Sequence, residues 1–187
     1  MQPVAKALLG CLLLLMLPLA GCTAAPVKES VNDAETLVEI EDPCMLATQS
    51  SLQSLVSIQV DGEDRFFRLS VPSSTPGTKL PIVLAFHGGG DAEEDFPQQN
   101  QFDQLGETEK FIMVYAIADS DRTVAEGDWY LNSAATSRED NDFSEQIVDE
   151  LAQVFCIDED RLYATGYSLG SMFTYEIACQ LNQRFAA

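Results

Sequence analysis

The stretch that decides the fold is RLYATGYSLGSM, residues 161–172, near the end of the printed sequence. It begins as a β-rich run, passes through a G-x-S-x-G pentapeptide and continues into a helical pattern at 169–181. A serine in this setting lies on a turn so tight that only glycine fits two residues before and after it, as Gly166 and Gly170 do. The following helix N-terminus directs backbone N–H groups toward developing negative charge. The pattern predicts Ser168 as a nucleophile; the alternative is a structural glycine-rich turn.

A second glycine motif, His87-Gly88-Gly89-Gly90, follows the apolar run LPIVLAF at 80–86. With a nucleophile elbow, an oxyanion hole combines the N–H after the nucleophile with one from the loop after an early strand. We therefore expect the N–H groups of Leu169 and Gly89 to be the donors, with Gly88 and Gly90 shaping the loop. His87 is interpreted as a loop-shaping residue, because the base of such folds follows the serine in the chain. A role as general base is the alternative.

The runs around these motifs predict part of a mixed sheet. Residues 54–60 and 65–71 are β-rich and flank the turn signal Asp61-Gly62, which predicts an antiparallel hairpin. The apolar runs 80–86 and 111–116, together with 161–165, predict strands buried on both faces. Before the last strand, apolar residues at helical spacing predict a crossover helix: Phe143, Ile147, Val148, Leu151, Val154 and Phe155. Asp142 and Glu145 are expected to cap it. This order predicts an α/β fold, antiparallel at its start and parallel afterwards.

Residues 1–21 predict a lipoprotein signal peptide. Lys6 precedes an apolar run at 7–17 that is shorter than the ~20 residues a membrane-spanning helix needs. The following Leu-Ala-Gly-Cys22 resembles the lipobox of bacterial lipoproteins, in which Cys22 is lipidated; an ordinary secretory signal is the alternative. We expect an exported protein, held at the bacterial outer membrane, cell surface or periplasm by its lipid alone. Residues 22–48 are predicted to form an acidic tether and 49–187 a folded domain.

The composition excludes some partners. The chain has 30 acidic against 10 basic residues and a formal net charge of −20, so no nucleic-acid partner is expected.

With Cys11 in the signal and Cys22 lipidated, three cysteines remain in a compartment where disulfides persist. Cys156 and Cys179 flank the elbow and are a candidate disulfide, which would leave Cys44 unpaired. The sequence has no C-x-x-C or His/Cys cluster, so no metal site is predicted.

Several motifs together resemble the polyhydroxybutyrate depolymerase and feruloyl esterase family, the secreted carboxylesterases of carbohydrate esterase family 1 and its relatives. The resemblance rests on the hairpin with Arg65, Phe67 and Val71-Pro72, on LAFHGGG (84–90), FIMVY (111–115), Asp140-x-Asp142-Phe143, and RLYATGYSLGSM. It covers about residues 54–187 and implies an α/β-hydrolase fold for the 49–187 domain. It also implies Ser168 as nucleophile, Gly89 and Leu169 as oxyanion donors, and no cofactor.

The same resemblance implies ester substrates, either polyhydroxyalkanoate oligomers or feruloyl and acetyl groups on plant polysaccharide. Leu169-Gly170-Ser171 departs from the small-residue or Asn-Gly-Gly pattern common in the family, which leaves the substrate open. Trp129 and Tyr130 are candidates for lining an acyl or aryl pocket. Buried packing is the alternative for both aromatic residues.

In this family the catalytic acid and histidine follow the serine. No histidine follows Ser168, and the one acidic residue after it is Glu176, within the elbow helix. The resemblance therefore implies the N-terminal portion of the fold, truncated after that helix, with residues 161–165 left as an aggregation-prone apolar edge. Three functions stay open: an exported ester hydrolase whose triad is incomplete in this chain, a non-catalytic ester- or glycan-binding lipoprotein, and a hydrolase of another α/β class such as a peptidase or lipase.

Overall fold

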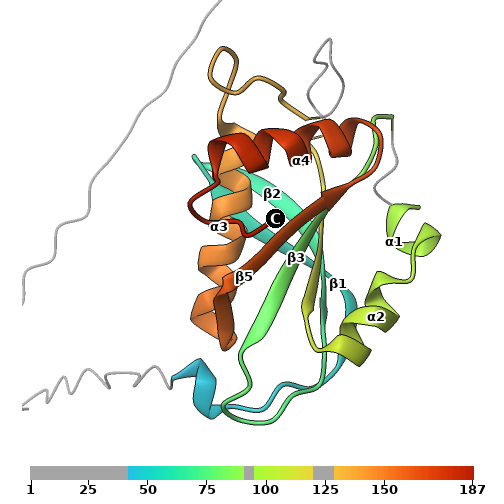
Figure 1. The fold of residues 1–187 in the computed structure, drawn as a ribbon, viewed down its shortest axis with the longest axis vertical. Coiled ribbons are helices and arrows are strands. Elements are labelled where there is room, and N and C mark those ends of the chain that lie inside the picture. The colour runs from blue at the N-terminus through green and yellow to red at the C-terminus, as the bar shows by residue number, and fades with distance from the viewer. Residues whose placement is uncertain (1–41, 91–94, 120–128) are drawn as a thin grey trace, which may run out of the picture. The chain divides into compact units, whose positions relative to one another are not determined.

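The computed structural model of the protein describes residues 42–90, 95–119 and 129–187. The predicted signal peptide, Cys22 and most of the tether lie outside these residues. In chain order the elements are η1 (Pro43–Met45), β1 (Ser51–Val60), β2 (Glu63–Val71), β3 (Leu80–Phe86), α1 (Phe96–Gln99), α2 (Phe102–Glu109), β4 (Ile112–Ala116), α3 (Glu139–Val154), β5 (Ile157–Gly166) and α4 (Leu169–Gln180) (Figure 1). None of the helices in the described ranges is long and apolar enough to cross a membrane.

The strands form one mixed sheet in the order β1-β2-β4-β3-β5. The β1–β2 hairpin is antiparallel, and β2 also runs antiparallel to β4. Strand β3 lies between β4 and β5 and runs parallel to both. The predicted α/β fold, antiparallel at its start and parallel afterwards, is confirmed.

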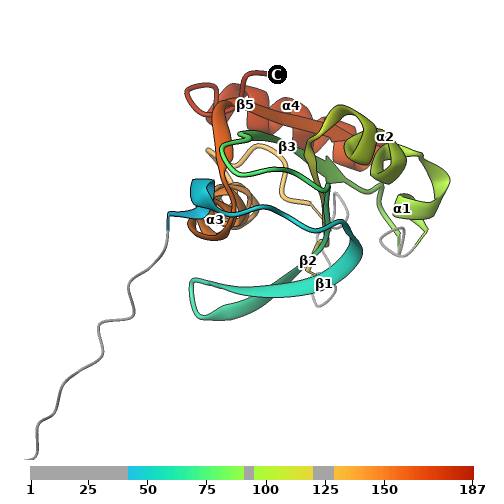
Figure 2. The same cartoon turned by 90° about the horizontal axis from the view of Figure 1, so that it is seen from below.

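Successive side chains of β3 point to opposite faces of the sheet and pack into two different clusters. Leu80, Ile82, Leu84 and Phe86 join a core with apolar residues of α3 and α4. Val83 and Ala85 face a smaller cluster with Phe96 of α1 and Phe102 of α2. Both views show α1 and α2 on one side of the strands and α3 on the other (Figures 1 and 2). Because both faces are covered, a continuous apolar run is what this strand requires.

The start of α3 differs from the prediction. The helix begins at Glu139, its N-cap is Arg138, and no side-chain cap hydrogen bond forms. Asp142 lies within the first turn and pairs with the Arg138 guanidinium at 3.3 Å, so the predicted capping box with Glu145 is wrong. Three acidic residues in that turn complement the positive end of the helix dipole instead.

A buried ion pair joins the hairpin to α3. Arg65 of β2 donates to Asp140 Oδ1 at 2.9 Å, and both side chains are almost fully excluded from solvent. The guanidinium also lies 4.1 Å from the ring centroid of Phe143. The second oxygen of Asp140 accepts from the Tyr130 N–H at 2.7 Å. These contacts connect β2, α3 and the segment entering α3.

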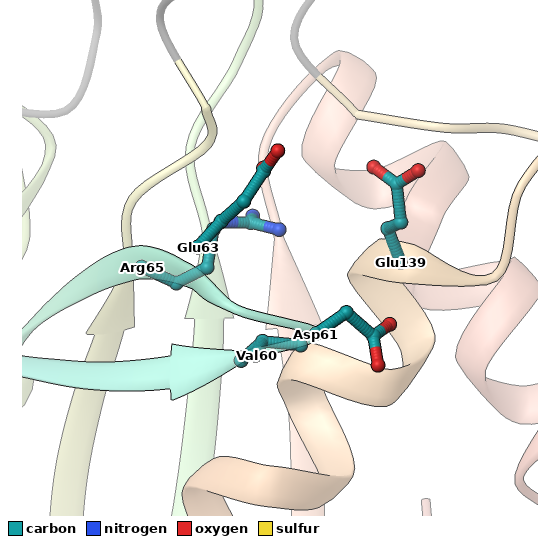
Figure 3. A pocket seen from close by; sticks show the side chains of 5 residues that line it. All are labelled: Val60, Asp61, Glu63, Arg65 and Glu139. Atoms are coloured by element: carbon teal, nitrogen blue, oxygen red, sulfur yellow. The ribbon is translucent and has the colours of Figure 1, made fainter.

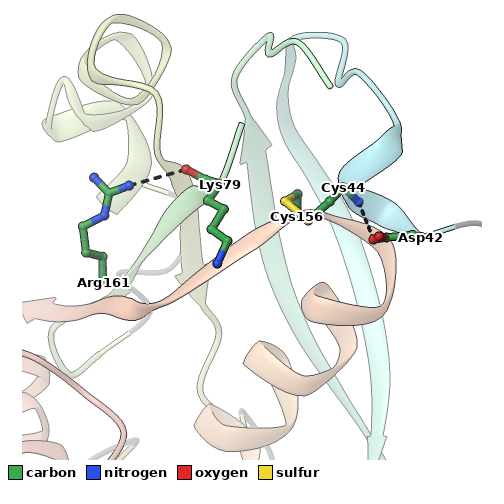
Figure 4. Close-up of a disulfide and its surroundings, with 5 residues drawn as sticks. All are labelled: Asp42, Cys44, Lys79, Cys156 and Arg161. Atoms are coloured by element: carbon green, nitrogen blue, oxygen red, sulfur yellow. Dashed lines mark hydrogen bonds between the residues drawn. A yellow bond between two sulfur atoms is a disulfide. The ribbon is translucent and has the colours of Figure 1, made fainter. Parts of the chain in front are cut away.

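The disulfide differs from the predicted Cys156–Cys179 pair. Cys156, just before β5, is bonded to Cys44 in η1 (Figure 4). Cys179 is an exposed free thiol. The Asp42 carboxylate accepts from the Cys44 N–H at 2.9 Å and orders this short helix. Residues 42–48, predicted as part of the tether, are thus fastened to the sheet. The bond was missed because the two cysteines are 112 residues apart in the chain.

The outer edge of β5 is partly covered by the last residues of the sequence. The Ala186 N–H donates to the Leu162 carbonyl, and the Ala164 N–H donates to the Ala187 carbonyl, both at 2.8 Å. Phe185 is buried beside them. The predicted apolar edge at 161–165 therefore has some of its backbone groups paired.

Candidate active site

Ser168 occupies a strained turn between β5 and α4. Its φ of 52° and ψ of −118° lie in a region that residues with a side chain rarely adopt. The side chain is exposed at the end of the sheet where the parallel strands have their carboxyl termini. The Tyr167 N–H donates to the Phe86 carbonyl at 3.1 Å, which connects the turn to the end of β3. This is the geometry of a nucleophile elbow.

The two glycines of the pentapeptide are required by contact with the backbone. A Cβ on Gly166 would lie 2.3 Å from the Gly170 carbonyl oxygen. A Cβ on Gly170 would lie 2.1 Å from the Phe86 oxygen and 2.4 Å from the His87 oxygen. All three distances are far below the closest approach of real Cβ atoms, 3.0 Å. The helix α4 can therefore approach the end of β3 only with glycine at these positions.

The glycine loop after β3 lies directly against the elbow. The Cβ position of Gly88 is 3.3 Å from Ser168 Cβ, and that of Gly89 is 3.5 Å from Leu169 Cδ2. Gly90 has a left-handed φ of 79°, which turns the chain away after the contact. Leu169 is the first residue of α4, where backbone N–H groups lack helical partners. The structure thus brings together the two residues predicted to donate to an oxyanion.

His87 is buried, and both of its ring nitrogens are engaged. Nδ1 lies 2.7 Å from the Gly88 carbonyl oxygen and donates to it, while Nε2 accepts from the Ala118 N–H at 3.1 Å. No ring nitrogen is left to take a proton from Ser168. The geometry agrees with the loop-shaping interpretation and leaves the general base unassigned within this sequence.

Trp129 is fully buried rather than lining a pocket. Its ring stacks on Phe173 of α4 at 5.3 Å between centroids and meets Phe86 edge-on at 5.2 Å. Its Nε1–H donates to the His87 carbonyl at 2.9 Å. Tyr130 is half-buried next to it. Of the two interpretations, packing holds for Trp129.

Glu176, the acidic residue of α4, binds the segment before α3. Its Oε1 accepts from the Ser133 N–H at 2.9 Å and from the Ser133 hydroxyl at 2.6 Å. Asn141 of α3 donates to the same hydroxyl at 2.8 Å. Glu176 is therefore committed to holding this segment and is not placed to orient a catalytic histidine.

A cavity of about 370 Å³ adjoins the elbow. Its walls come from α1, α2 and the end of β5: Phe96, Gln99, Asn100, Phe102, Thr165, Gly166 and Tyr167. The Asn100 amide is fixed, because its oxygen accepts from the Tyr115 hydroxyl and its nitrogen donates to the Phe96 carbonyl. These aromatic side chains were not predicted from the sequence. Helices α1 and α2 are too short to show the hydrophobic periodicity from which a helix is predicted, and α1 begins with Phe-Pro.

A second hollow, of about 250 Å³, lies beside the hairpin turn and the start of α3 (Figure 3). Asp61, Glu63 and Glu139 surround it, with Val60 and Arg65. The guanidinium of Arg65 is already paired with Asp140. Within the described ranges, no group of three or more His, Cys, Asp or Glu side chains is arranged to hold a metal ion.

Comparison with known proteins finds relatives that are named as esterases. No protein-family model matches the chain. It is 28% identical over 127 residues to a bifunctional acetylxylan esterase/xylanase of Neocallimastix patriciarum, covering 67% of this chain and 17% of that protein. It is also 26% identical over 170 residues to NocK of Nocardia uniformis subsp. tsuyamanensis, which is named as a candidate esterase. This match covers 87% of this chain and 46% of NocK. The chain thus spans less than half the length of these relatives.

Solved structures give the same fold. The acetyl xylan esterase of Aspergillus awamori matches with a TM-score of 0.58 and 22% identity, over 72% of this chain and 50% of that one. Other solved serine hydrolases and carboxylesterases match over similar shares of their chains. The described residues therefore have the α/β-hydrolase fold of these esterases, in the part of that fold which the chain covers.

Proposed function

We propose that this chain carries the nucleophile and the oxyanion hole of an exported carboxylic ester hydrolase. The observation that carries the proposal is the strained Ser168, set at the N-terminus of α4 with the glycine loop packed against it. Its substrates are esters of the kinds named by the family resemblance: polyhydroxyalkanoate oligomers, or acetyl and feruloyl groups on polysaccharide. The acetylxylan esterase names among the relatives support the second kind.

The chemistry follows from the geometry. Ser168 Oγ attacks the ester carbonyl carbon and gives up its proton to a base. The carbonyl oxygen becomes an oxyanion that accepts from the N–H groups of Leu169 and Gly89. As this intermediate collapses, the protonated base gives the proton to the leaving oxygen, which releases the alcohol and leaves an acyl group on Ser168. Water then hydrolyses the acyl ester to the free acid and restores the serine. Losing one oxyanion donor typically costs about 2.7–4 kcal/mol of transition-state stabilisation.

His87 does not supply the base in this proposal. His87 is the one histidine of the sequence, and both of its nitrogens are engaged. A serine hydroxyl without a base is a poor nucleophile at neutral pH. The oxyanion hole and substrate binding alone support roughly 10³–10⁴-fold acceleration over water in enzymes that lack their triad.

The disulfide supports export. The Cys44–Cys156 bond is of a kind that persists in oxidising compartments and is rare in the cytosol. Together with the signal peptide and lipobox predicted at 1–22, it favours a lipid-anchored protein at the bacterial outer membrane or cell surface. Radiolabelled palmitate incorporation that is lost in a Cys22→Ser variant tests this address.

The test of the activity uses the full chain with p-nitrophenyl acetate, with and without imidazole as an external base. Hydrolysis above background should depend on Ser168, rise with imidazole, and disappear in a Ser168→Ala variant. Equal rates for the two proteins at every imidazole concentration would refute the proposal. Methyl ferulate, tributyrin and a peptide p-nitroanilide then separate the acyl classes and the peptidase alternative.

A second candidate is a non-catalytic protein that binds esters or glycans. The engaged ring of His87 favours it, because neither of its nitrogens is free to accept a proton from Ser168. Calorimetry with acetylated xylo-oligosaccharides, followed by analysis of released acetate, separates the two. Binding heat without acetate release, with or without imidazole, supports the second candidate.

A further inference from the structure

Trp129 connects the three parts that form the candidate oxyanion hole. It lies just before α3, far from both glycine motifs in the chain, and its side chain is completely buried. Its indole contacts Phe86 at the end of β3, His87 of the glycine loop and Phe173 of the elbow helix. Phe86 and Phe173 also meet each other edge-on at 4.8 Å. The ring is therefore in contact with the end of β3, the glycine loop and α4 at once.

The indole also makes a directed contact with the glycine loop. Its Nε1–H donates to the His87 carbonyl oxygen at 2.9 Å. The same carbonyl oxygen lies only 2.4 Å from the position that a Cβ on Gly170 would occupy. The same peptide unit thus faces Trp129 on one side and the elbow helix on the other. The next peptide unit, which carries the Gly89 N–H, is held by the ring of the same residue, because His87 Nδ1 donates to the Gly88 carbonyl at 2.7 Å.

The segment that carries Trp129 is itself fastened to the rest of the site. The Tyr130 N–H donates to buried Asp140, and Ser133 donates twice to Glu176 of α4. Asn141 of α3 donates to the Ser133 hydroxyl. The indole is therefore held from α3 and α4, independently of the glycine loop that it contacts.

We infer that Trp129 is a positioning residue for the oxyanion hole, acting through its hydrogen bond to His87. This rests on the proposed function, since an oxyanion forms only if Ser168 attacks an ester. The indole touches no reacting atom. Its N–H sets the orientation of the peptide after His87, and its ring sets the spacing between the loop and α4.

The sharpest test removes the N–H and keeps the ring. The sequence has one tryptophan, so growth with β-(3-benzothienyl)alanine replaces only Trp129, substituting sulfur for the N–H in a ring of the same shape. Trp129→Phe is the genetic counterpart. Phe143→Leu is the matched control, because Phe143 of α3 is equally buried but its ring packs against the guanidinium of Arg65.

We expect Ser168-dependent hydrolysis of p-nitrophenyl acetate by the benzothienyl protein to lose about tenfold to a hundredfold in kcat, with KM within about twofold of the starting protein. Affinity for phenylboronic acid, which forms a tetrahedral adduct with serine, should fall by the same factor. Amide exchange at residues 87–90 should accelerate. The Phe143→Leu protein should lose stability without these changes.

The outcomes separate the two claims. If hydrolysis requires Ser168 but kcat of the benzothienyl protein is unchanged, the role of Trp129 is refuted and the proposed function stands. A rise in KM at constant kcat would have the same meaning. Absence of Ser168-dependent hydrolysis in the starting protein would refute the proposed function. Amide exchange at 87–90 then decides the inference alone, and exchange unaffected by the replacement would overturn it.

Discussion

Gly170→Ala tests the close approach on which the candidate site depends. The new Cβ would lie 2.1 Å from the Phe86 carbonyl oxygen, about 0.9 Å inside the closest approach that real Cβ atoms show. The His87 oxygen is nearly as close, at 2.4 Å. Both obstacles are backbone atoms of buried residues, so no side-chain rotation relieves the contact. The elbow helix and the end of β3 must separate.

The size of this separation sets the expected effects. Overpacking of this kind costs about 1–3 kcal/mol, which lowers Tm by roughly 2–12 °C for a domain of this size. Oxyanion donors act only within about 2.7–3.1 Å of the developing charge, and misplacement by about 1 Å can cost ~10²-fold in rate. We therefore expect Ser168-dependent hydrolysis by the Gly170→Ala protein to fall about a hundredfold.

The measurements are thermal unfolding by circular dichroism and hydrolysis of p-nitrophenyl acetate with imidazole. Gly62→Ala is the control: Gly62 has a left-handed φ of 90° in the hairpin turn and no atom within 4 Å of its Cβ position. The control should cost about 1–2 kcal/mol through backbone strain and leave the rate constant unchanged. A Gly170→Ala protein with the Tm and rate of the parent would show that the contact is not as close as described.

Three further changes test the fold. Arg65→Met should cost about 3–5 kcal/mol, because it leaves the Asp140 carboxylate buried without its cation; a Tm near that of the parent would contradict the buried pair. Cys44→Ser should lower stability by about 2–5 kcal/mol in non-reducing buffer, and excess reductant should bring the parent to the same Tm; a parent insensitive to reductant would show that the disulfide is absent. The hydrogen bond from Lys110 holds the pKa of Glu107 at about 2 rather than 4.5, so its contribution to stability is complete above about pH 5 and lost as pH falls toward 2. The Tm difference between the parent and Glu107→Gln should therefore close over that range, and a constant difference would exclude this linkage.

Most of the fold was predictable because its signals are local. The run at 80–86 is apolar throughout, and β3 has the predicted bounds. The hairpin follows from Asp61-Gly62 between two β-rich runs, and the elbow from glycines placed where any Cβ would overlap backbone. In each case a few neighbouring residues determine the structure.

The remaining features depend on contacts between distant parts of the chain. Cys44 meets Cys156 across 112 residues, and the Ala118 N–H meets His87 across 31. Neither pairing leaves a periodic signal in the sequence. The role of Trp129 is of the same kind, since a tryptophan beside a tyrosine is equally compatible with a pocket wall and with the core. Tertiary contacts decide between such alternatives.

The central claim is that Ser168 is a nucleophile held at an oxyanion hole. Its most direct test is peptide mapping by mass spectrometry after brief exposure of the full chain to p-nitrophenyl acetate and imidazole. The account predicts one acetyl group on the peptide that contains Ser168, accumulating because the engaged ring of His87 does not speed its removal, and none there in the Ser168→Ala protein. Acetylation confined to lysines, with Ser168 unmodified, would contradict it.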